Sequence, residues 1–218
     1  MNLKLEKNDI KSSKCLEEFN EFSHKLGHDL RNVLSALEGY IVLLEEEYDQ
    51  DIINRLKKVI DTSLTLTNKS VELADAYLPI SKKEPVNISE IFSQTAKKFD
   101  LTKIDLQIGN VGSVKAHTDR LSRVFYQLIE NSLLHAKSSF IHLQRKKSDE
   151  KILLIYTTDG KLMSDSLLDK LKTGKRIKGR GLEICEKNIH NHGWDFSIEK
   201  NQNKMYFIIG IPEDQFLD

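Results

Sequence analysis

Cysteine, proline and long apolar runs are all scarce in this chain of 218 residues. Its two cysteines, Cys15 and Cys185, lie far apart in the sequence, so their spacing indicates neither a disulfide framework nor a zinc site. No apolar run reaches the roughly 18 residues that a membrane-spanning helix needs, and residues 1–4 do not open a secretory signal. We therefore expect a cytoplasmic protein with no membrane segment.

The chain also lacks an excess of charge of either sign. Lysine plus arginine and aspartate plus glutamate number 33 each, so the formal net charge at pH 7 is zero. A neutral chain has no overall field that would attract nucleic acid or an anionic membrane. With 39% hydrophobic and 30% charged residues, the composition is typical of a soluble globular protein of one or two domains. We expect protein partners, and neither nucleic acid nor membrane.

What the sequence does contain is a long amphipathic pattern near its N-terminus. Apolar residues recur three or four positions apart, which predicts a helix with one apolar face: Phe19, Phe22, Leu26, Leu30, Val33, Leu37, Tyr40 or Ile41, and Leu44. At about 100° per residue, His28 points away from this face and toward solvent. An exposed imidazole is available for chemistry near neutral pH.

His28, Asp29 and Asn32 form a polar group on the solvent side of this helix. Asp29 can accept a hydrogen bond from one ring nitrogen of His28, which leaves the other nitrogen unprotonated as a nucleophile. Asn32 lies one turn further along on the same side. The alternative is a solvated surface histidine without a role. His24 lies four residues before His28, a spacing that can hold a metal ion, but no third ligand is evident, so we expect no metal site.

The first part of the chain is predicted to be a helical hairpin, residues 1–80. A second amphipathic helix follows a charged turn and runs from Ile52 to about Leu78. One partner helix cannot cover the wide apolar stripe on the first helix, so a second copy of the hairpin would complete a four-helix bundle, and we expect a homodimer. Two of the three prolines fall within 78–85, which indicates a linker.

The second part, residues 85–218, shows a mixed pattern of helices and strands. Helices are expected over 88–99, over 119–136 and within 177–192, and strands over 104–108, 140–143, 151–156, 196–199 and 205–211. This order predicts an α+β sandwich with helices on one face of a mixed sheet. His190 and His192 flank the expected end of the last helix and are expected to be capping or surface residues. Trp194 and Tyr206 are expected to pack the closing strands.

The run His28–Asn32, continued by 34–40, resembles the H-box of bacterial sensor histidine kinases. The resemblance implies that His28 carries a phosphoryl group, that Asp29 assists its transfer, and that Asn32 helps to position water for dephosphorylation. Val33 stands where many members carry proline. This change should remove a helix kink and leave the chemistry intact.

The second part resembles the ATP-binding domain of the same kinases, a GHKL-type α/β sandwich. The run 119–135 resembles the N-box helix, in which Asn131 would reach a magnesium ion that bridges nucleotide phosphates. Gln127 stands where the family often has a second asparagine. Gly179 and Gly181 resemble the second glycine box, where backbone amides approach phosphate, and Gly160 lies in the first.

The first glycine box departs from the family pattern. The family's adenine-reading aspartate falls on Thr158, which has no carboxylate to accept a bond from the adenine amino group. Leu162 replaces a glycine where the backbone should pass close to the base, and Glu183 places a negative charge near the phosphate path. Asp159 could substitute for the missing carboxylate only if the register shifts. The resemblance therefore implies a vestigial pocket, and we expect no cofactor.

Three functions from different classes are compatible with these features. The favoured one is a histidine phosphotransferase that passes a phosphoryl group between response-regulator aspartates through His28, with receiver domains as partners. The alternative is a soluble ATP-dependent histidine kinase that uses ATP and Mg²⁺ to phosphorylate itself on His28. The third is a binding or scaffold protein that sequesters a regulator. Nucleotide binding separates the first two, and phosphorylation of His28 separates both from the third.

Overall fold

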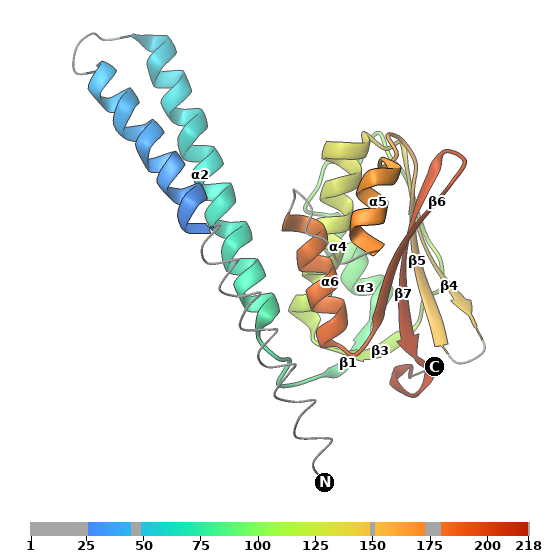
Figure 1. The fold of residues 1–218 in the computed structure, drawn as a ribbon. Coiled ribbons are helices and arrows are strands. Elements are labelled where there is room, and N and C mark those ends of the chain that lie inside the picture. The colour runs from blue at the N-terminus through green and yellow to red at the C-terminus, as the bar shows by residue number, and fades with distance from the viewer. Residues whose placement is uncertain (1–25, 45–48, 149–150, 173–179, 218) are drawn as a thin grey trace. The chain divides into compact units, whose positions relative to one another are not determined.

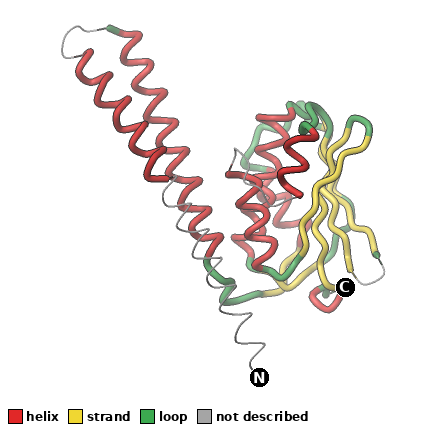
Figure 2. The backbone as a smooth tube through the Cα atoms, viewed as in Figure 1, coloured by secondary structure: helices red, strands yellow, loops and turns green. Residues whose placement is uncertain are grey.

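The structure, a computed structural model, describes residues 26–44, 49–148, 151–172 and 180–217 (Figure 1). The chain divides into two compact units between Tyr77 and Leu78. In the first unit, a helix over 26–44 and α2 (Gln50–Tyr77) lie side by side as a hairpin, as both ribbon and tube views show (Figure 2). Both predicted helices of the hairpin are therefore present. Cys15, His24 and Gly179 lie outside the described residues.

The apolar stripe predicted for the first helix is only half-buried in a single chain, at Leu26, Leu30, Val33 and Leu37. Other apolar side chains are more exposed: Leu34 and Ile41 on the first helix, and Ile60, Leu64 and Val71 on α2. The hairpin alone therefore leaves apolar surface in contact with water. None of the helices in the described ranges is long and apolar enough to cross a membrane.

The second unit is built on a five-stranded sheet in the order β2-β4-β5-β7-β6. The strands are β2 (Asp105–Ile108), β4 (Phe140–Lys147), β5 (Lys151–Thr158), β7 (Lys204–Pro212) and β6 (Asp195–Asn201). Only β2 and β4 pair in parallel; every other neighbouring pair in this sheet is antiparallel. A separate antiparallel pair joins β1 (Glu84–Asn87) to β3 (Ser113–Ala116).

Four α-helices cover one face of this sheet (Figure 1). They are α3 (Ile88–Ala96), α4 (Thr118–Asn131), α5 (Asp165–Lys172) and α6 (Arg180–Asn191), and a short 3₁₀ turn, η2 (Glu213–Gln215), lies near the C-terminus. Alternate residues of β5 point into the core, where Leu154 and Tyr156 are almost fully buried. Phe92 meets the rings of Phe125 and Tyr156 edge-on, at centroid distances of 5.1 and 6.1 Å. The predicted α+β sandwich, with helices on one face of a mixed sheet, is confirmed.

Several local predictions differ from the structure. The predicted linker over 78–85 is too long, because Glu84 and Pro85 already pair with β3. The predicted helix over 119–136 is α-helical only to Asn131 and continues as a π-helix, η1 (Ser132–Ala136). The buried Tyr156 hydroxyl lies 2.8 Å from Ser132 Oγ and donates to the Leu128 carbonyl at 3.3 Å, beside the helical bond that this carbonyl accepts from the Ser132 amide.

Candidate functional site

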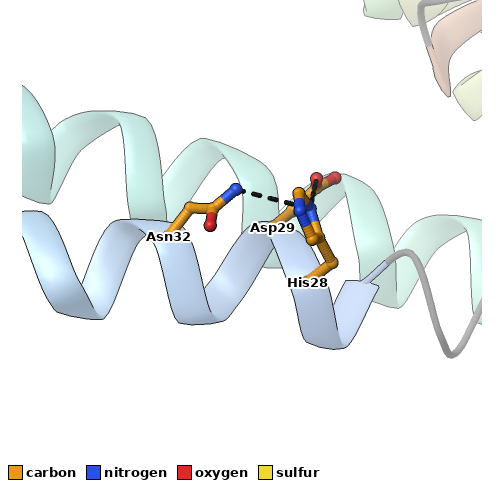
Figure 3. Close-up of polar contacts among 3 residues, drawn as sticks. All are labelled: His28, Asp29 and Asn32. Atoms are coloured by element: carbon orange, nitrogen blue, oxygen red, sulfur yellow. Dashed lines mark hydrogen bonds and ion pairs between the residues drawn. The ribbon is translucent and has the colours of Figure 1, made fainter.

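His28 lies on the exposed side of the first helix, as predicted. Its side chain is 67% exposed, and that of Asp29 is 30% exposed. His28 Nδ1 lies 3.5 Å from Asp29 Oδ1 and 3.3 Å from Asn32 Nδ2 (Figure 3). The helix brings the three side chains together because one turn separates His28 from Asn32, while Asp29 is the next residue.

Both contacts of the imidazole are made by the same ring nitrogen. A proton on Nδ1 faces the Asp29 carboxylate, at a distance where the attraction is mainly electrostatic. The Asn32 amide can present its oxygen to this N–H, or its nitrogen when Nδ1 is unprotonated. Nε2 takes part in neither contact. With the proton on Nδ1, Nε2 carries the lone pair and faces no competing partner from this group, which suits it to attack an electrophile.

The second predicted group, around the nucleotide, is brought together only in part. Asn131 ends α4 and Gly181 lies in the first turn of α6, where a Cβ on the glycine would stand 2.6 Å from Gln127 Oε1 and 3.5 Å from Asn131 Nδ2. A larger residue there would have to displace the end of the Gln127 side chain, so glycine allows the two helices to lie close together. Gly160 has a φ of +91°, and a Cβ on it would overlap the Ala136 carbonyl oxygen. Both glycines therefore have a packing role in this unit.

At the position that resembles the adenine site, hydroxyl groups bond to each other. Thr158 and Ser138 are buried, and their hydroxyl oxygens lie 2.6 Å apart. Ser138 also donates to the Asp159 carbonyl at 2.8 Å. The Thr158 hydroxyl is therefore hydrogen-bonded to a neighbouring loop of the same unit.

Asp159 does not supply the missing carboxylate. Its side chain accepts bonds from the Ser139 amide at 2.8 Å, the Phe140 amide at 2.9 Å and the Ser139 hydroxyl at 2.6 Å. Although burial raises its pKa, these hydrogen bonds hold the pKa of Asp159 below the usual value for an aspartate. The carboxylate therefore bonds to the 139–140 turn, which counts against the hypothesis that Asp159 substitutes in a shifted register.

The two other departures have local structural explanations. Leu162 packs, partly buried, against the hydrophobic core. Glu183 lies in the first turn of α6, where the helix dipole favours a negative side chain. Within the residues that the structure describes, no group of three or more histidine, cysteine, aspartate or glutamate side chains could hold a metal ion.

His192 is not the surface residue that its position at a helix end predicts. It is 1% exposed, its Nδ1 lies 2.7 Å from the Asn188 carbonyl, and its Nε2 accepts a bond from the His117 amide at 3.0 Å. The ring stacks on Trp194 with centroids 4.5 Å apart. Burial lowers the pKa of His192 to about 4, so the ring is neutral at pH 7. Sequence reasoning missed it because its partner His117 lies 75 residues away.

Comparison with known proteins adds relatives of one kind. No protein-family model matches the chain. The chain is 22% identical to the sensor protein VanS of Enterococcus faecium over an alignment of 238 positions, gaps included. It is 23% identical to sporulation kinase E of Bacillus subtilis over an alignment of 227 positions. These alignments cover 95% and 94% of this chain, but 61% and 30% of the two relatives. The chain therefore spans less than two thirds of the length of either.

Solved structures of histidine kinases share the fold. The Acinetobacter baumannii histidine kinase AdeS superposes with a TM-score of 0.67 at 18% identity, covering 85% of this chain and 97% of that one. Histidine kinase ThkA, in complex with response regulator TrrA, superposes with a TM-score of 0.69 at 19% identity, covering 88% of this chain and 61% of that one. ShkA in complex with AMPPNP superposes with a TM-score of 0.58 at 12% identity, covering 88% of this chain and 45% of that one. The chain is therefore similar in sequence to histidine kinases over most of its length and shares the fold of their solved structures.

Proposed function

We propose that the chain is a histidine phosphotransferase of a two-component phosphorelay. In this proposal, His28 accepts a phosphoryl group from the aspartyl phosphate of one response-regulator receiver and passes it to the aspartate of another. The observation that carries the proposal is the exposed imidazole of His28, whose Nδ1 faces Asp29 and Asn32 while Nε2 takes part in neither contact. A receiver can reach this nitrogen because the side chain is 67% exposed.

The chemistry requires a nucleophile and a charge partner, and this group offers both. Nε2 attacks phosphorus, the phosphorus–oxygen bond to the receiver aspartate breaks, and the aspartate leaves as a carboxylate while a phosphorus–nitrogen bond forms. The ring becomes positively charged with its proton kept on Nδ1, and the Asp29 carboxylate at 3.5 Å stabilises that charge. Transfer to a second receiver reverses these steps. Asn32 would position water for the competing loss of phosphate.

The second unit supports a relay that does not consume ATP. Thr158 and Asp159 both direct their polar groups to the 138–140 loop, so neither offers adenine the carboxylate that the family uses. A hydrogen bond to a charged group contributes roughly 1.5–3 kcal/mol, and its loss weakens binding about ten- to hundredfold. We therefore propose that this unit keeps the fold of an ATP-binding domain without its cofactor.

A soluble histidine kinase that phosphorylates His28 from ATP·Mg²⁺ remains the second candidate. It is favoured by the close approach of Gly181 to Asn131, which preserves the arrangement of the N-box and the second glycine box. Its relatives include sporulation kinases, and ShkA, which shares the fold, binds AMPPNP. The comparisons favour both candidates about equally, so a measurement of nucleotide binding is needed to distinguish them.

Receiver domains are the partners that this proposal requires. The similar kinase ThkA is seen with a response regulator. For this chain we propose a receiver bound over His28, and a second copy of the chain bound to the exposed apolar residues of the hairpin. With no net charge, the chain depends on local rather than overall electrostatic complementarity to recognise a receiver.

The experiment that tests the proposal gives one purified protein two phosphoryl donors. Wild-type protein is incubated with labelled ATP·Mg²⁺, and in parallel with a receiver carrying a labelled aspartyl phosphate. We expect acid-labile label on the chain only from the receiver. Label from ATP would replace the relay by the kinase, and label from neither donor would favour the scaffold protein.

A further inference from the structure

We propose that Lys83 is a latch that fastens the segment after α2 to the C-terminal end of α6, so that free rotation of the chain between the two units is confined to the residues around Tyr77. This inference concerns the connection between the units and does not depend on the proposed phosphotransfer. It rests on contacts made within the second unit, which begins at Leu78.

The end of α6 has the geometry that attracts a cation. Gly193 has a φ of +77°, and the amides of Gly193 and Trp194 bond back to the carbonyls of His190 and Ile189 at 2.9 and 3.2 Å. This left-handed turn ends the helix and leaves the carbonyl of His192 beyond it. Carbonyl oxygens at a helix C-terminus carry a partial negative charge, which lysine side chains neutralise. The Lys83 ammonium donates to the His192 carbonyl at 2.5 Å.

Lys83 also reaches the C-terminal part of the chain. Its ammonium donates to Gln215 Oε1 at 3.2 Å, and the same oxygen accepts a bond from Trp194 Nε1 at 2.9 Å. Burial lowers the pKa of Lys83, while the charge of Asp214 raises it. One lysine therefore joins the segment after α2 to α6 and to η2.

The start of the same segment is held by a second bond to the same helix end. Asn191 Nδ2 donates to the Leu78 carbonyl at 3.2 Å. Beyond Lys83, Glu84 pairs with Ala116, and its carboxylate accepts a bond from the Thr118 hydroxyl at 2.8 Å. Before Leu78, α2 is helical to Tyr77. The predicted linker is thus attached to the second unit at both ends, which leaves few residues whose backbone can rotate freely.

The latch has a consequence for the helix that it binds. The other end of α6 carries Gly181, where a Cβ would stand 2.6 Å from Gln127 Oε1 and 3.5 Å from Asn131 Nδ2 of α4. A displacement of Leu78 or Lys83 would therefore act on the helix that carries Gly181 of the second glycine box.

Native-state proteolysis of the full chain with thermolysin tests the latch. This protease cleaves before Ile80 but not before Leu78, because Pro79 follows Leu78, and cleavage requires the segment to detach. We compare Lys83→Gln with Lys82→Gln, the matched control, which removes the neighbouring exposed ammonium; glutamine adds no thermolysin site to the segment. We expect Lys83→Gln to be cleaved here about tenfold faster than wild type, because a bond from a charged donor is lost, and Lys82→Gln to be cleaved at the wild-type rate. Equal rates for the two variants would overturn the proposal.

A second variant pair keeps the test decisive if Lys83→Gln does not fold. Asn191→Ala removes the bond to Leu78, and His190→Ala changes an exposed neighbour on the same helix. Cleavage before Ile80 should become several-fold faster only in Asn191→Ala. No acceleration in a folded Asn191→Ala protein would contradict the latch. The assay contains neither receiver nor nucleotide, so its result is independent of the proposed phosphotransfer.

Discussion

Two histidines of this chain show how surroundings decide the chemistry of one side chain. His28 is 67% exposed, and its two contacts both involve Nδ1, which leaves Nε2 accessible. His192 is 1% exposed, and both of its ring nitrogens are used, Nδ1 by the Asn188 carbonyl and Nε2 by the His117 amide. The first is suited to exchange a group with a partner, and the second holds two helices' ends together.

Replacing His28 should abolish phosphotransfer without unfolding the protein. We expect His28→Gln to carry no acid-labile label from a phosphorylated receiver, because glutamine has no nucleophilic nitrogen, while its circular dichroism spectrum stays that of wild type. His190→Gln is the matched control, since His190 is also exposed on a helix. Label retained by His28→Gln would place the acceptor elsewhere, with His24 as the next residue to test.

The buried His192 should make the stability of the second unit depend on pH. An unfolded histidine binds a proton below about pH 6.5, whereas burial lowers the pKa of the folded His192 to about 4. The unfolded state therefore takes up a proton first. The stabilising effect is fully present above pH 6.5 and is lost as the pH falls toward 4, to a total of about 3 kcal/mol.

Urea denaturation at several pH values checks this expectation. The free energy of unfolding of the wild type should decline between pH 6.5 and 4. His192→Gln should be less stable at pH 7, because it loses the stacking on Trp194, and should show a flatter profile over the same interval. Parallel profiles for the two proteins would mean that other groups cause the decline.

At the scale of helices and strands, the prediction about the nucleotide rests on Thr158, at the end of β5. Its hydroxyl is bonded to Ser138, and the neighbouring Asp159 is committed to the 139–140 turn. We expect isothermal calorimetry to detect no ATP·Mg²⁺ binding up to about a millimolar, since losing a bond to a charged acceptor alone weakens binding about ten- to hundredfold. Micromolar binding would instead favour the kinase.

Long periodic elements could be predicted from the sequence, whereas β1, β3 and the π-helix η1 were not predicted. The helices α2 and α6 show a clear apolar period, and each is close to its predicted bounds. β1 and β3 have four residues each, and each pairs with the other rather than with the five-stranded sheet. Ser132, the first residue of η1, lies within hydrogen-bond distance of the Tyr156 hydroxyl on β5, 24 residues away in the sequence. A pattern read locally cannot include that partner.

The two candidate sites also differ in how much of each could be predicted from the sequence. His28, Asp29 and Asn32 lie within one turn of one helix, so spacing alone places them together. The hydrogen bonds of the Asp159 carboxylate come from Ser139 and Phe140, about twenty residues earlier in the chain. They form because β4 pairs with β5. The sequence predicts that Thr158 lacks the family's adenine contact, but it does not predict the loop to which both side chains bond.

At the scale of the whole molecule, the hairpin leaves apolar side chains uncovered on both of its helices. Leu34 and Ile41 are 62% and 50% exposed, and they lie seven residues apart, on one side of the first helix. On α2, Ile60, Leu64 and Val71 are 40%, 58% and 57% exposed and also share a side. Burying apolar surface contributes roughly 25 cal/mol per Å², which a second copy of the hairpin would supply.

Charge placed on this surface should separate the copies without unfolding a single chain. We expect the wild type to be a dimer by light scattering at micromolar concentration, and Leu64→Lys to be a monomer, because an unpaired ammonium in an apolar interface costs several kcal/mol. Since Leu64 is exposed in the single chain, the variant should keep its helical circular dichroism signal. Thr62→Lys is the matched control: Thr62 is exposed about 200° around the same helix, and its variant should remain a dimer. A monomeric wild type would contradict the dimer, whereas a dimeric Leu64→Lys would move its interface away from this side of α2.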